Sequence, residues 1–183
     1  GANVSGSINC VTGDAPLQSG YSAWSGPHLE VPLSYNVTRS LTADFGVGGS
    51  FNLNVTSDAL YFRDYANIET GGPYEGQSDL LSDNINLNQP GTIEFTFSGL
   101  TAGTYSMESF HHSTFAPSTV LFDIIVEDLL GTRTVVSGAN TSRGTYPTSI
   151  AALLYELTVG ADGTATVTFG SSFIDYGLPL SIN

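Results

Sequence analysis

Apolar and polar residues alternate with a period of two along nearly the whole chain, and the spacing of an amphipathic helix is almost absent. Because neighbouring side chains of a strand point to opposite faces, this alternation predicts half-buried antiparallel strands. The clearest candidates are 93–97, 105–112, 120–126, 153–159 and 165–169, and shorter ones are 4–10, 29–35, 51–55, 60–62, 134–136 and 178–182.

Turn residues separate several of these candidate strands. The glycine-bounded segment 99–103 is typical of a short hairpin connection, so we expect 105–112 to pair back against 93–97. Ser57 and Asp58 predict a further turn between two short strands, and Pro32 indicates an edge or irregular strand.

About ten short strands with turn signals between them predict an all-β fold. We expect one domain over residues 1–183, a two-sheet antiparallel β-sandwich of jelly-roll type. Two stretches, 12–28 and 63–89, do not show the alternation and are predicted as long loops, which usually carry function. The expected core residues are Phe95, Phe97, Phe122, Ile124, Leu157 and Phe169.

The charge composition excludes two classes of partner. The 183 residues include 17 carboxylates, four arginines and no lysine, for a formal net charge of -13. Nucleic acids and anionic membranes need clustered cations, so neither is an expected partner. The apolar runs are also far shorter than the roughly 20 residues that span a bilayer, and we expect no membrane insertion. The single cysteine, Cys10, is expected to be a small buried hydrophobe.

Aromatic side chains in the two predicted loops indicate a candidate carbohydrate site. Ring faces pack against sugar C–H groups, and planar polar side chains orient the sugar. The candidate residues are Tyr21, Trp24, Arg63, Tyr65 and Tyr74. The alternative is that Trp24 and one or more of the tyrosines cap the ends of the sandwich core.

Asp79 and Asp83 are candidate calcium ligands, since they lie in a segment rich in Asp and Asn, whose side-chain oxygens calcium prefers. The segment lacks the regular spacing of an EF-hand, and turn formation is the alternative role of these residues. No other cofactor is expected. His111 and His112 are neighbours on a strand and point to opposite faces, so they do not chelate one metal. We expect one or both to have a hydrogen-bonded structural role at the rim of the sandwich, and contact with a ligand is the alternative.

The chain contains none of the motifs G-x-S-x-G, H-E-x-x-H or the P-loop, and no motif marks a catalytic pair among its carboxylates. We therefore expect a non-enzymatic protein. Four N-glycosylation sequons, at Asn3, Asn36, Asn54 and Asn140, fit an extracellular or cell-surface location.

Four segments together carry a family resemblance: FRDYANIETGGPYEGQSDLLSDNI, GTIEFTFSGLTAGTYSMESFHHST, FDIIVEDLLGTRTV and LPLSIN. From Tyr61 to Asn183 the chain resembles β-sandwich modules of large secreted or surface-attached bacterial proteins. These modules are loosely similar to malectin-like and galactose-binding-like carbohydrate-binding modules. The resemblance implies a fold and an extracellular setting rather than a reaction.

Two functions follow as hypotheses. The first is a structural or adhesive module of a surface layer, fibre or matrix, whose terminal strands join copies of itself or other surface proteins by completing a neighbour's sheet. The second is a carbohydrate-binding module that uses the loop aromatics. The first is favoured because the strand pattern continues to both ends of the chain.

Overall fold

Strands make up the regular structure of the described residues, which in this computed structural model are 8–12, 22–26, 34–44, 50–64, 83–87, 91–113, 121–143, 151–171 and 180–182. No helix occurs within these ranges, so the all-β prediction is confirmed for this part of the chain. The strands are β1 (Ile8–Thr12), β2 (Ser22–Gly26), β3 (Ser34–Asp44), β4 (Ser50–Asp64), β5 (Asp83–Leu87), β6 (Gly91–Ser98), β7 (Gly103–Ser113), β8 (Leu121–Asp128), β9 (Gly131–Asn140), β10 (Ser142–Arg143), β11 (Ala151–Val159), β12 (Ala165–Ser171) and β13 (Leu180–Ile182).

The larger of two antiparallel sheets has the strand order β13-β5-β4-β6-β12-β8-β9, with β3 paired to β4. Its register aligns the apolar residues of neighbouring strands. Leu53 lies opposite Phe97, and Val55 lies opposite Phe95, which in turn faces Val167. Because the side chains of these aligned residues share one face, the sheet has a continuous apolar surface.

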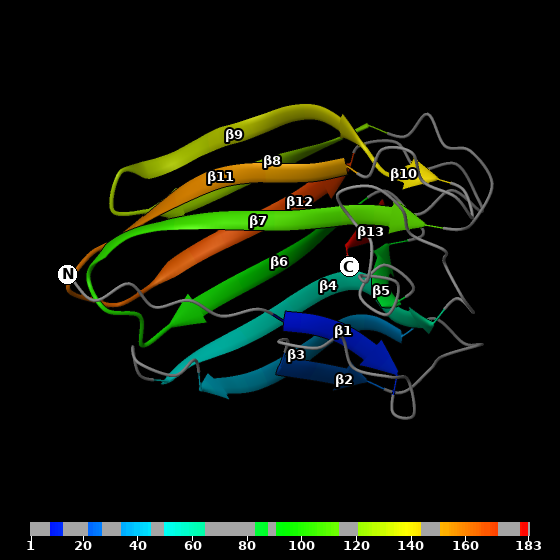
Figure 1. The fold of residues 1–183 in the computed structure, drawn as a ribbon, viewed down its shortest axis with the longest axis horizontal. Helices are drawn as coiled ribbons and strands as arrows, with labels where there is room; N and C mark the ends of the chain where they lie inside the picture. The colour runs from blue at the N-terminus through cyan, green and yellow to red at the C-terminus, as the bar shows by residue number, and fades with distance from the viewer. Residues whose placement is uncertain are drawn as a thin grey trace, which may run out of the picture.

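The smaller sheet consists of β7 and β11, paired antiparallel, with the two-residue β10 added in parallel to β7. Figure 1 shows β7 and β11 lying across β8 and β12 of the larger sheet. β1 and β2 form a separate parallel pair that lies close to β4 and β5.

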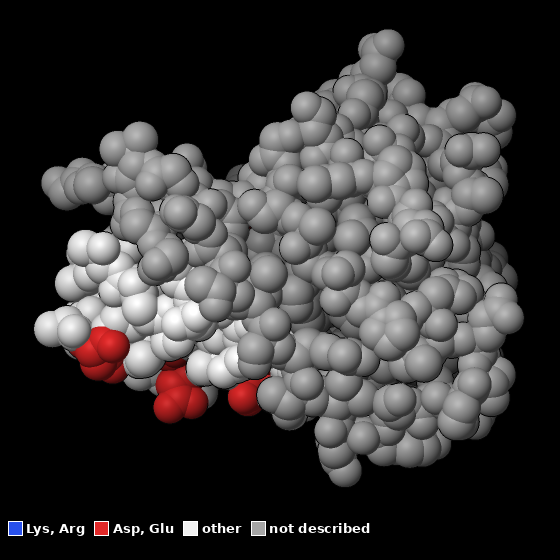
Figure 2. All heavy atoms as spheres, turned by 90° about the horizontal axis from the view of Figure 1, so that it is seen from below, with Lys and Arg blue, Asp and Glu red and all other residues white. Residues whose placement is uncertain are grey.

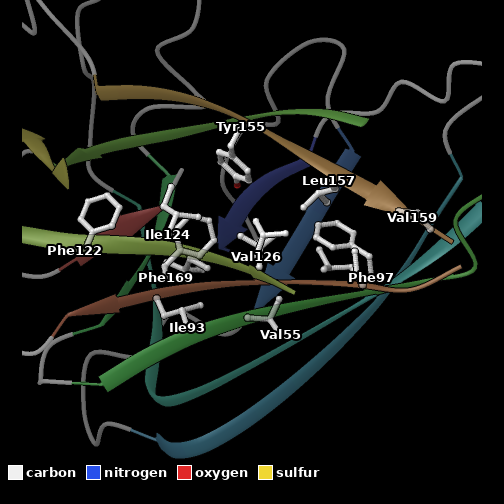
Figure 3. Close-up of a cluster of buried hydrophobic side chains, with 14 residues drawn as sticks. Val55, Ile93, Phe97, Phe122, Ile124, Val126, Tyr155, Leu157, Val159 and Phe169 are labelled. Carbon is white, nitrogen blue, oxygen red and sulfur yellow. The ribbon is translucent and has the colours of Figure 1, made fainter. Parts of the chain in front are cut away.

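One buried cluster contains side chains from both sheets. In Figure 3, Tyr155, Leu157 and Val159 of β11 point toward the apolar face of the larger sheet. Of the six expected core residues, Phe97, Phe122, Ile124, Leu157 and Phe169 are buried. Phe95 is half-buried at the edge of the cluster, and its ring meets that of Phe169 edge-on at 5.4 Å between centroids.

The predicted pairing of 105–112 with 93–97 is wrong. β6 pairs with β4 and β12, whereas β7 pairs with β11 in the other sheet. The segment 99–103 therefore connects the two sheets instead of closing a hairpin. Leu100 of this connection packs against the core and donates its N–H to the carbonyl of Gly163 at 3.0 Å.

Several predicted strand limits also need correction. Ser57 and Asp58 form no turn, because β4 continues through them and Ser57 pairs with both Val37 and Ile93. β2 and β5 are strands inside the stretches 12–28 and 63–89, so the loop prediction is wrong for these residues. The expected strand 29–35 is described only from Ser34, where β3 begins.

Candidate functional site

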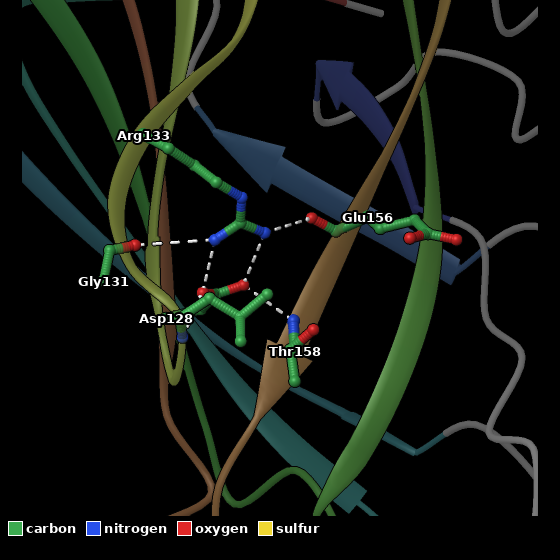
Figure 4. A network of polar contacts seen from close by, with 6 residues as sticks. Asp128, Gly131, Arg133, Glu156 and Thr158 are labelled. Atoms are coloured by element: carbon green, nitrogen blue, oxygen red, sulfur yellow. Dashed lines mark hydrogen bonds and ion pairs between the residues drawn. The ribbon is translucent and has the colours of Figure 1, made fainter.

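Two side chains, Asp128 and Arg133, connect the two sheets, and we call them the inter-sheet bridge. Asp128 ends β8 and accepts a hydrogen bond from the N–H of Leu130 at 2.9 Å, which fixes the turn into β9. The guanidinium of Arg133, on β9, donates to both carboxylate oxygens of Asp128, at 2.5 and 2.9 Å (Figure 4). This bidentate geometry is the strongest form of a carboxylate–arginine pair.

The inter-sheet bridge also binds the backbone of β11, the outermost strand of the smaller sheet. Asp128 accepts from the N–H of Thr158 at 2.7 Å, and Arg133 donates to the carbonyl of Glu156 at 3.1 Å. The N–H of Leu129 donates to the carbonyl of Thr158 at 2.9 Å. These three bonds satisfy backbone groups that an edge strand otherwise presents to solvent.

The hydrogen bonds from Arg133 hold the pKa of Asp128 down to about 2, with smaller contributions from the N–H groups of Thr158 and Leu130. Burial acts in the opposite direction and is outweighed. The carboxylate is fully buried, whereas the Arg133 side chain is 31% exposed. The inter-sheet bridge is therefore charged on both sides at neutral pH, and its role is to hold the sheets together.

A second polar group lies within the core. Ser109 Oγ and His111 Nε2 share a hydrogen bond at 2.8 Å, and the His111 ring packs against Phe122 at 4.7 Å between centroids. Tyr155 forms a side-chain hydrogen bond with Ser109, and burial raises the pKa of its hydroxyl to about 12. The predicted hydrogen-bonded role of His111 is confirmed. The rim location is wrong, because both His111 and His112 are fully buried.

The terminal strands β1 and β13 were expected to form the assembly site. Within the described residues, β1 pairs with β2 along one edge, and β13 pairs with β5 along one edge. No described strand pairs with the second edge of either one.

Two of the five candidate carbohydrate-binding residues lie on strands. Trp24 is on β2, in register with Cys10 of β1, and Arg63 is near the end of β4, in register with Asn84 of β5. Tyr21, Tyr65 and Tyr74 lie outside the described residues. The grouping of these five side chains into one site therefore stays a prediction.

The candidate calcium ligand Asp83 is the first residue of β5 and lies in register with Asp64 of β4. The other candidate, Asp79, lies outside the described residues. Where side chains are described, no group of three or more His, Cys, Asp or Glu residues is arranged to hold a metal ion.

Of the four sequon asparagines, Asn54 and Asn140 are exposed. Asn36 lies on β3, in the part of the chain where only the backbone is described, and Asn3 lies outside the described residues.

The charged side chains on the face shown in Figure 2 are carboxylates. On the face in Figure 2, several Asp and Glu side chains protrude, and no Lys or Arg atom is visible among the coloured residues. Glu94 and Glu127 lie on the outer side of the larger sheet, where their registered neighbours Thr168 and Thr166 are hydroxyl residues. This outer face is therefore polar and acidic. The described residues contain no helix long and apolar enough to cross a membrane.

The inter-sheet bridge was not predicted from the sequence. The signal in the sequence was the turn pattern of 128–131, with Asp at the first position and Gly at the fourth. Arg133, one of the four arginines of the chain, follows two residues later.

No family model, curated protein or solved structure shows a significant match to this chain. The functional assignment therefore depends on the residues themselves.

Proposed function

We propose that this protein is a non-enzymatic structural or adhesive module, a subunit of an extracellular surface layer, fibre or matrix. The observation that supports it is the arrangement of the terminal strands: among the described residues, β1 and β13 each have a strand partner along one edge only. A strand with an open edge offers a row of backbone donors and acceptors to a neighbouring chain.

For the fold, we propose a single β-sandwich domain of jelly-roll type. The support is the buried cluster to which both antiparallel sheets contribute, as expected when two sheets face each other across one core. An extracellular location is supported by the exposure of Asn54 and Asn140, which leaves both sequon side chains accessible to a glycan.

The experiment is deletion of residues 2–11, with assembly followed by light scattering and negative-stain electron microscopy. We expect the wild type to form assemblies and the deletion variant to lose them while it keeps its far-ultraviolet circular dichroism. Since the deletion also removes a partner of β2, a second measurement adds a synthetic peptide of residues 2–11 to the intact protein. Assembly that neither the deletion nor the peptide reduces would contradict the proposal.

A carbohydrate-binding module is the second candidate function. It is supported by the position of Trp24 on β2, in a strand pair that lies close to β4, the strand that carries Arg63. A glycan-array signal that Trp24→Ala abolishes and Trp24→Phe largely keeps would favour this function. The phenylalanine variant is the matched control because it retains an aromatic face for stacking.

A further inference from the structure

The outer edge of β11 has no strand partner among the described residues, because β11 is the last strand of its sheet. The hydrogen bonds that the carbonyl of Glu156 and both backbone groups of Thr158 make outside the sheet show that these groups point to this edge. In an antiparallel pair the backbone groups of alternate residues point to the same side, and the register of β11 with β7 is unbroken. Ala152 and Leu154 therefore also direct their N–H and C=O groups to the outer edge.

The inter-sheet bridge and the turn beside it occupy one end of this edge. Asp128 accepts from the N–H of Thr158 at 2.7 Å, and Arg133 donates to the carbonyl of Glu156 at 3.1 Å. In Figure 4 the carboxylate and the guanidinium both face β11. A strand from another chain would need the same backbone groups for its own ladder of hydrogen bonds. The two side chains stand where that strand would lie.

We propose that the inter-sheet bridge has a second role, as a cap that keeps the strands of other chains from pairing with the outer edge of β11. The inference goes beyond the proposed function and does not depend on it. Charged side chains placed at an edge, and edges that are short, are two means by which β-proteins avoid edge-to-edge aggregation. The bridge supplies both, because it places two charges at the edge and shortens its open part to the end that contains Ala152 and Leu154.

The open part of the edge shows why a cap matters. The side chain of Leu154 is 69% exposed, and an exposed leucine on an open edge favours aggregation. The formal net charge of -13 keeps chains apart at low ionic strength, but salt screens this repulsion. The carboxylate of Asp128 is fully buried, so salt screens its contacts much less. The cap therefore acts under conditions in which the net charge gives little protection.

The first measurement is hydrogen exchange at single amides of the full chain, followed by nuclear magnetic resonance. In the wild type we expect slow exchange at the capped N–H of Thr158 and fast exchange at the open N–H of Leu154. Asp128→Ala removes the acceptor and should speed exchange at Thr158 roughly tenfold, which is the equivalent of one lost hydrogen bond. Equally fast exchange at Thr158 and Leu154 in the wild type would overturn the proposal.

The second measurement is the rate of intermolecular β-sheet formation, followed by thioflavin T fluorescence in moderate sodium chloride. Asp128→Ala should aggregate fastest and the wild type slowest. Arg133→Met keeps the aliphatic stem but uncaps the carbonyl of Glu156, so its rate should be intermediate. This variant remains informative if Asp128→Ala does not fold. Aggregation of both bridge variants at the rate of the wild type would contradict the capping role.

A matched control separates loss of the cap from loss of stability. Leu53→Ala leaves a cavity in the core and keeps the bridge, and the variants are compared at temperatures that give them equal free energies of unfolding. Under these conditions Asp128→Ala should still aggregate faster. Adding Leu154→Pro to Asp128→Ala removes an outward N–H without breaking a hydrogen bond to β7, and should slow aggregation without restoring stability. Equal rates for Leu53→Ala and Asp128→Ala, or no effect of the proline, would overturn the proposal.

Discussion

The inter-sheet bridge provides the sharpest stability prediction, and the perturbation is Asp128→Asn. The substitution keeps the size of the side chain but removes the charge that holds Arg133 and that accepts from the N–H of Thr158. Leaving one buried N–H poorly paired costs about 1 to 3 kcal/mol. Water can replace part of the hydrogen bonding that the Arg133 guanidinium loses, because that side chain is 31% exposed.

The pKa gives a second estimate of the same quantity. Lowering the pKa of Asp128 from 3.8 to about 2 corresponds to roughly 2 kcal/mol of stability at neutral pH. Since the folded-state value is depressed, this contribution is complete above about pH 4 and is lost as the pH falls through 2. We therefore expect Asp128→Asn to reduce the free energy of unfolding by about 2 kcal/mol at pH 7 and by little at pH 2.

The assay is urea unfolding at pH 7 and at steps down to pH 2, followed by tryptophan fluorescence and circular dichroism. Glu127→Gln is the matched control, because Glu127 is the exposed neighbour and the charge change is the same. Equal stabilities of the two variants at pH 7 would refute the reasoning. So would a difference between wild type and Asp128→Asn that persists unchanged at pH 2.

Four further predictions concern the core, the charge, one turn and calcium. Phe122→Ala removes a ring that is 2% exposed and should cost about 3 to 5 kcal/mol in urea unfolding, and a cost below about 1 kcal/mol would contradict its place in the core. Moderate sodium chloride should raise the melting temperature, since most carboxylates have no cation to pair with, and a flat or falling curve would oppose this. Gly163→Ala should lower the melting temperature, because Gly163 has a φ of +71° and an added Cβ would lie 2.8 Å from the Leu100 carbonyl oxygen. Gly138→Ala should lower it less, because an added Cβ there has open space around it. If calcium binds near β5, calcium chloride should raise the melting temperature above the effect of an equal ionic strength of sodium chloride, and Asp83→Asn should remove that excess.

Local alternation predicted the strands well where one face is apolar and the other polar. Phe97 and Phe169 were placed in strands and in the core because their neighbours along the chain are Thr, Ser or Gly. β5 was missed because its Ile85 and Leu87 stand among asparagines, which also favour turns. The signal for this strand was present but ambiguous.

Strand pairing was not predictable in the same way. One of the two partners of β6 is β12, about 70 residues further along the chain. Nothing within 91–103 indicates that the following strand crosses to the other sheet. The inter-sheet bridge depends equally on this distant arrangement, because Asp128 meets Thr158 only after β11 is in place. Such contacts follow from tertiary packing, which residue spacing does not encode.

Because β7 belongs to the smaller sheet, the two sheets form at different stages of folding. β7 pairs antiparallel with β11, and the whole β8–β9 hairpin lies between them in the chain. β8 and β9 can pair as soon as both are synthesised. The hydrogen bond between Ser109 of β7 and Tyr155 can form only after β11 has been synthesised. Contacts this far apart in sequence close slowly, so we expect the hairpin to form first and the smaller sheet to form late. Until then, the strand that carries the two buried histidines is exposed, and this interval is when the chain is most prone to aggregate.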